Sequence, residues 1–92
     1  MEQLTQHAAA RMQQRGITEQ TIECLVRYGS KAHDHQGGVV VYFDKQSRKR
    51  LKDGLGQQLL RKMESQLDAY AVISEYGEIV TVGHRTKRIN RH

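Results

Sequence analysis

The sequence predicts an α+β fold in which two N-terminal helices and a third helix pack on a small antiparallel sheet of about four strands. Two observations favour this class. Apolar residues recur at helical spacing through the first third of the chain. Two later stretches, rich in valine, isoleucine and tyrosine, flank glycine-containing turns as the strands of a hairpin do. Because 92 residues have room for one hydrophobic core, we expect one domain over residues 1–92.

The first part of that domain, residues 5–29, predicts a helical hairpin. The first helix should run from Thr5 to Arg15, because apolar residues recur every four positions along one side of it: Leu4, Ala8 and Met12. Gly16 then stands where a left-handed cap ends a helix. Thr18 is suited to cap the start of a second helix, and Gly29 is suited to end it.

The rest of the chain predicts two β-hairpins with a helical segment between them. Residues 31–43 predict the first hairpin and residues 69–84 the C-terminal one, each with a glycine in its turn. Residues 47–66 are basic and then amphipathic. We expect the third helix in the second half of this segment, beyond an irregular start marked by Gly54 and Gly56.

The charge of the chain favours a polyanionic partner. Lysine and arginine number 15 against 10 acids, which gives a net charge of +5. The excess is clustered between Lys45 and Lys52 and in a basic tail at residues 85–92. RNA or a ribosome carries the phosphates that such clusters bind, although solvated surface of no special function has the same composition.

Other functional classes are disfavoured. No stretch approaches the ~18 apolar residues of a membrane span, and the N-terminus lacks the apolar run of a secretory signal. Cys24 is the single cysteine, so it can form neither an internal disulfide nor a paired metal or redox motif, and we expect it to pack in the core. We therefore expect a cytoplasmic protein without a membrane partner.

Three ionisable side chains stand four residues apart on the first predicted helix: His7, Arg11 and Arg15. This spacing aligns them on one ridge beside the apolar ridge, at the lip of the groove between helix and sheet. Cleavage of RNA without a metal needs groups that take and give a proton, and cations that hold the phosphate. His7 and the two arginines would supply one proton-transfer group and two clamps. His84, at the end of the last predicted strand beside Arg85, is the candidate for the second proton-transfer group.

The same row has a structural interpretation. Arginine stems pack along the edge of a core while their charged ends stay in water, and cations near the end of a helix stabilise it. Tyr42 and Tyr70 on the predicted strands are likewise either base-stacking residues or, more often, core residues with the hydroxyl at the rim. Both interpretations stay open at this point.

Metal and nucleotide chemistry have little support. His33 and His35 alternate around Asp34, but two histidines do not make a metal site without a third ligand. The glycine pairs lack the Lys-Ser or Lys-Thr that completes a phosphate-binding loop. The sequence therefore predicts no metal and no cofactor.

The run His7-Ala8-x-x-Arg11-Met12-x-x-Arg15-Gly16-Ile17 resembles the opening helix of a family of small bacterial domains of unknown function. The resemblance covers residues 7–43 and 68–84. That family is distantly similar to RelE-type and barnase-type ribonuclease toxins, in which a helical start packs on an antiparallel sheet that carries the active groups. The resemblance puts His7 and Arg11 on the family's motif and matches His84 loosely to polar residues ending the last strand. It also implies a cognate antitoxin as partner.

Three functional hypotheses follow. The first is a toxin-like domain that binds RNA or cleaves it without a metal through His7 and His84, with these phosphate clamps: Arg11, Arg15 and Arg85. The second is a non-catalytic nucleic-acid or ribosome-associated module whose phosphate contacts are Arg48, Lys49, Arg50, Arg85, Lys87 and Arg88. The third is a protein-interaction or dimerisation domain with an apolar docking face at Leu59, Leu60 and Met63. The sequence leaves the oligomeric state open.

Overall fold

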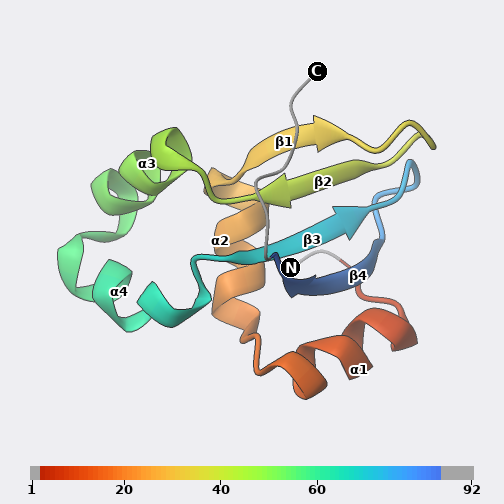
Figure 1. The fold of residues 1–92 in the computed structure, drawn as a ribbon, viewed down its shortest axis with the longest axis horizontal. Helices are drawn as coiled ribbons and strands as arrows, with labels where there is room; N and C mark the ends of the chain where they lie inside the picture. Colours follow the sequence, from red (N-terminus) through yellow and green to blue (C-terminus); the bar gives the residue numbers. More distant parts are fainter. Residues whose placement is uncertain (1–2, 86–92) are drawn as a thin grey trace.

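A computed structural model describes residues 3–85 as a four-stranded antiparallel sheet with helices packed against it (Figure 1). The strands lie in the order β1-β2-β3-β4, so each strand pairs with its neighbour in sequence. The predicted α+β class is confirmed. In chain order the elements are α1 (Gln6–Arg15), α2 (Glu19–Tyr28), β1 (Ser30–His33), β2 (Val39–Tyr42), α3 (Lys45–Leu55), α4 (Gln57–Lys62), the 3-10 turn η1 (Glu64–Gln66), β3 (Ala69–Ile73) and β4 (Ile79–His84).

The ends of α1 and α2 are set by local contacts, of which the sequence predicts those of Gly16 and Thr18. The hydroxyl of Thr5 accepts from the Ala8 N–H at 3.1 Å, and Thr18 caps α2 in the same way. Gly16 ends α1 with φ of 65°, a left-handed conformation that suits glycine. Both predicted helices are present, but they do not pack on each other as a hairpin would: α1 lies along β4, whereas α2 packs on β2 and β3.

The helix predicted in the second half of residues 47–66 is present as α4, but the irregular start predicted before it is wrong. The basic first half of the segment is itself a helix, α3, because Asp44 and Ser47 form a capping box at its start. Leu51 gives α3 a buried side. Gly56, with φ of 84°, ends α3 and separates it from the short helix α4. The segment thus holds two helices and η1 where the sequence predicts one helix.

The core lies between the sheet and α2. Val41, Ala71 and Val82 occupy one register row across β2, β3 and β4, and all three are fully buried. Ile22 and Leu25 of α2 belong to the same core cluster and are fully buried as well. Cys24 is also buried, as predicted. The amphipathic pattern of α2 therefore fixes which face of the sheet it covers.

Helix α1 lies along the outer edge of β4 and runs in the same direction (Figure 1). Before the helix, the Thr5 N–H donates to the Ile79 carbonyl (3.0 Å), and the Ile79 N–H donates to the Gln3 carbonyl (2.8 Å). Further along, Arg11 Nε donates to the Val82 carbonyl (3.2 Å). Ten residues of helix and six of strand have similar lengths, about 15 and 20 Å, which allows contacts along the whole edge.

Candidate nucleic-acid interface

The row on α1 meets β4, but its three members have different surroundings. His7 is exposed near the start of the helix. Arg11 is half-buried and anchors α1 to β4 through the Val82 carbonyl. The side chain of Arg15 is exposed, whereas its main-chain carbonyl contacts His84. Arg11 therefore has a structural contact, and the two residues beside it in the row present their side chains to solvent.

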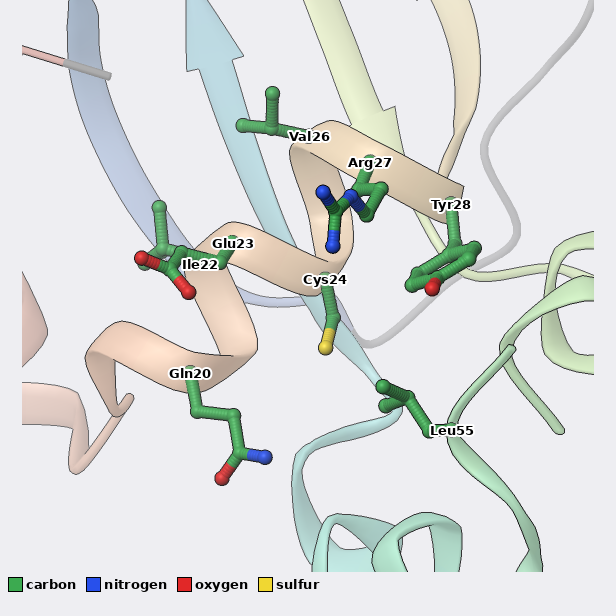
Figure 2. Close-up of a pocket in the computed structure, with 8 residues that line it drawn as sticks. All are labelled: Gln20, Ile22, Glu23, Cys24, Val26, Arg27, Tyr28 and Leu55. Atoms are coloured by element: carbon green, nitrogen blue, oxygen red, sulfur yellow. The ribbon is translucent and has the colours of Figure 1, made fainter. Parts of the chain in front are cut away.

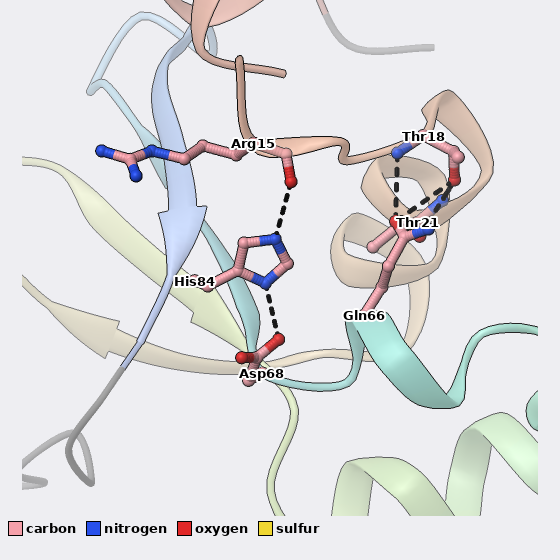
Figure 3. Close-up of polar contacts among 6 residues, drawn as sticks. All are labelled: Arg15, Thr18, Thr21, Gln66, Asp68 and His84. Atoms are coloured by element: carbon pink, nitrogen blue, oxygen red, sulfur yellow. Dashed lines mark hydrogen bonds and ion pairs between the residues drawn. The ribbon is translucent and has the colours of Figure 1, made fainter. Parts of the chain in front are cut away.

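The imidazole of His84 joins three segments at the end of β4 (Figure 3). Its Nδ1 lies 2.6 Å from Oδ1 of Asp68, and its Nε2 lies 2.9 Å from the carbonyl oxygen of Arg15. Because both partners are acceptors, a ring protonated at both nitrogens satisfies the arrangement. The hydrogen bond to Asp68, followed by that to the Arg15 carbonyl, raises the pKa of His84 above its ordinary value. His84 thus bridges α1, β4 and the residue before β3 through contacts that favour the charged ring.

The structure does not bring His7 and His84 together at one point. His84 contacts Arg15, eight residues beyond His7 on the same helix. A rise of 1.5 Å per residue separates those two positions by about 12 Å along the helix axis. Direct proton transfer to one phosphodiester requires each group within about 3 Å of the reacting oxygen. The two histidines are therefore poorly arranged to act on the same bond.

A second polar cluster, also drawn in Figure 3, joins η1 to the start of α2. Oε1 of Gln66 accepts from the Thr21 hydroxyl (2.6 Å) and from the Thr18 N–H (3.1 Å). Gln66 thus holds η1 to the start of α2, and Asp68 holds the segment before β3 to the end of β4 through His84. Sequence reasoning missed both residues, because each partner lies at least 16 positions away and no short motif marks the pair.

Besides Arg11, two more of the predicted phosphate-binding arginines donate to main-chain carbonyls. Nε and Nη2 of Arg50 lie 3.3 and 3.1 Å from the carbonyl oxygen of Tyr28. Arg85 donates to the Phe43 carbonyl, and its guanidinium lies 5.4 Å from the centre of the buried Tyr42 ring. These contacts fasten α3 to the end of α2 and the end of β4 to β2. Arg50 and Arg85 therefore have partners within the fold.

The remaining cations of the basic block form one ridge on α3. They lie at positions i, i+3, i+4 and i+7, within about 100° of arc and over about 10 Å of helix, and all are exposed. Within residues 3–85, no ion pair joins any of them to an acid. We call this ridge the α3 stripe: Lys45, Arg48, Lys49 and Lys52. Arg48 and Lys49 were predicted as phosphate contacts, whereas Lys45 and Lys52 were recognised only as part of the basic block.

Several other predicted features contribute little to this interface. Lys87 and Arg88 lie outside the described residues. His33 ends β1, and Asp34 closes the turn after it by accepting from the N–H groups of Gln36 and Gly38, which lowers the pKa of Asp34. Among residues 3–85, no three histidine, cysteine or acidic side chains gather as metal ligands would. None of the helices in that range combines the length and apolarity needed to cross a membrane.

The fold and surface define a class: a small α+β domain whose first helix covers one sheet edge and whose third helix presents a cationic ridge. The chain belongs to the family described as Domain of unknown function (DUF4258), whose sequence model matches residues 4–84. That match agrees with the resemblance of the opening helix to such a family. No curated protein and no solved structure shows a significant match to the chain.

Proposed function

We propose that this domain binds RNA by holding the phosphate backbone of a strand along the α3 stripe. One observation carries the proposal: four exposed cations share a helix ridge, and no ion pair within the described residues neutralises them. Exposed cations release the counterions of a phosphate backbone when they bind it, which is the main source of sequence-independent affinity. The domain would work in the cytoplasm, where single RNA strands are accessible.

The proposal is a binding function and assigns no proton transfer to His7 and His84. Both ring nitrogens of His84 are engaged within the fold, and His7 lies about two helical turns from the carbonyl that His84 contacts. A toxin-like ribonuclease, with the RelE-type or barnase-type likeness and an antitoxin partner, would need a different set of catalytic groups. The binding function needs only cations that are already exposed.

Binding is tested by fluorescence anisotropy with a labelled 12-nucleotide RNA at several salt concentrations. A variant with Arg48→Gln, Lys49→Gln and Lys52→Gln should bind at least tenfold more weakly at low salt. Its plot of log affinity against log salt should be shallower by about 2, since each lost phosphate contact removes about 0.7 from the slope of a single strand. Glutamine suits a helix, so α3 should remain folded.

The matched control removes the same charge from other exposed positions: Lys31→Gln, Arg61→Gln and Lys62→Gln. This control should keep the wild-type slope within about 0.7, the contribution of one phosphate. An equal loss in both variants would show that net charge, not the α3 stripe, attracts RNA, and the proposal would fail. Incubation of the same RNA with protein and EDTA should leave it intact. Cleavage that disappears in His7→Ala would instead restore the ribonuclease hypothesis.

A further inference from the structure

A cavity of about 450 Å³ lies between α2 and the α3–α4 connection (Figure 2). Its size falls within the range of about 300–1,000 Å³ that is usual for small-ligand pockets. Cys24 and Leu55 provide an apolar floor, and Gln20, Glu23 and Arg27 provide a polar rim. Burial, with a smaller effect from Glu23, raises the pKa of the Cys24 thiol, so the floor is uncharged at neutral pH. The cavity therefore combines an apolar interior with polar groups at its mouth.

One wall of this cavity is the half-buried ring of Tyr28, whose position is fixed from two sides. A side chain at Gly54 would place its Cβ 2.5 Å from the Tyr28 hydroxyl and 2.7 Å from the ring carbons. Glycine inside a helix is less favourable than alanine, but here it lets the ring approach the backbone of α3. The carbonyl of Tyr28 is held by Arg50. The ring is thus a preorganised flat surface beside an open cavity.

The rim supplies groups for an anion and for a heteroaromatic ring. The guanidinium of Arg27 lies over the cavity between Cys24 and Tyr28 in Figure 2, and no hydrogen bond or ion pair within residues 3–85 engages it. Arginine grips phosphate oxygens in pairs. The amide of Gln20 donates and accepts hydrogen bonds, and the carboxylate of Glu23 accepts them, as base edges require. An aromatic ring beside a guanidinium matches a base attached to a phosphate.

The cavity also adjoins the α3 stripe. Arg48, Lys52 and Leu55 stand at i, i+4 and i+7, so the stripe continues along one helix face to the cavity floor. We infer that the cavity receives one nucleotide of the bound RNA strand, with its base against the Tyr28 ring and its phosphate at Arg27. This inference rests on the proposed RNA-binding function and adds to it a pocket for a single extruded nucleotide.

The test is an NMR titration of the ¹⁵N-labelled protein with adenosine 5′-monophosphate. Amides of Cys24, Arg27 and Leu55 should shift and saturate, whereas inorganic phosphate at the same concentrations should not saturate them. Tyr28→Leu should weaken binding at least about fivefold, because base stacking on an aromatic ring contributes at least about 1 kcal/mol. Tyr28→Phe keeps the ring and should bind within twofold of wild type. If the leucine variant does not fold, the phenylalanine variant still tests whether the ring, and not its hydroxyl, holds the base.

Further variants separate the cavity from the stripe. Arg27→Gln should reduce binding of the monophosphate to the level of adenosine. Tyr76→Leu, which alters the exposed tyrosine in the β3–β4 turn, should change nothing. The α3-stripe triple variant should bind the monophosphate normally even where it loses the RNA strand, so the two proposals can fail separately. The absence of shifts at the cavity would overturn the inference. Shifts there that depend on protein concentration alone would also overturn it and would indicate a second copy of the chain as the occupant.

Discussion

At the scale of single residues, His84 is predicted from the sequence as a proton-transfer group but has a structural role in the fold. Its imidazole stands between a carboxylate and a helix C-terminal carbonyl, and both favour the charged ring. A histidine that must be protonated to hold its contacts makes stability depend on pH. The same contacts make it a poor general base, because both ring nitrogens are already engaged within the fold.

The raised pKa of His84 predicts a loss of stability as pH rises. The stabilisation should be complete below the unfolded-state pKa of about 6.5 and should disappear as pH rises through the higher folded-state pKa. Since Asp68 is 51% exposed, we expect its size to be at most about 1 kcal/mol. Urea unfolding between pH 5.5 and 9 measures it.

The comparison that isolates this effect is wild type against His84→Gln and Asp68→Asn. The free energies of unfolding of wild type and of either variant should differ most at low pH and converge at high pH. Other titrating groups cancel in the difference. Parallel pH profiles for the three proteins would show that the bridge does not couple protonation to folding.

The residues whose roles could be predicted are those with partners close in sequence. Gly16 and Thr18 act on backbone groups within four positions, so the sequence contains the whole motif. The contact between His84 and Arg15 spans 69 positions, and that between Arg50 and Tyr28 spans 22. Whether a cation is exposed or tied to a carbonyl depends on such distant contacts. The basic block could therefore be predicted from the sequence. Which of its cations form the exposed α3 stripe, and that Arg50 is held by the Tyr28 carbonyl, could not.

At the scale of elements, α3 depends on its first turn. The Ser47 hydroxyl accepts from the Asp44 N–H (2.6 Å) and donates to the Asp44 carbonyl (3.1 Å), and both residues are buried. The helical spacing of the leucines predicts a helix in the second half of residues 47–66. The capping box sits at the other end and decides where the helix begins.

Ser47→Ala should lower the free energy of unfolding by about 1–2 kcal/mol, because it removes a cap and leaves a buried N–H without its acceptor. Urea denaturation monitored by circular dichroism measures the change. Ser65→Ala, at an exposed position in η1, is the control and should stay within about 0.5 kcal/mol of wild type. A cost at Ser47 no larger than that at Ser65 would contradict the importance of the box.

At the scale of the whole molecule, stability should be uneven. Helix α4 has no buried residue and no side-chain cap, whereas β2 and β3 are paired on both sides. Opening of α4 alone therefore breaks few buried contacts. Hydrogen–deuterium exchange should find the amides of residues 57–62 at least about tenfold faster than those of residues 69–73. Equal rates would mean that the α3–α4 connection opens only with the entire domain.

The covering of β4 has a consequence for self-association. Within residues 3–85, contacts from Gln3, Thr5 and Arg11 occupy backbone groups on the outer side of β4, so the strand at the other end, β1, is the sheet edge left for pairing. If two molecules joined through β1, each would present its covered β4 edge to solvent. Growth into a fibril needs two unpaired edges on every subunit, and the sheet of residues 3–85 leaves one, so strand-by-strand polymerisation would stop at a pair.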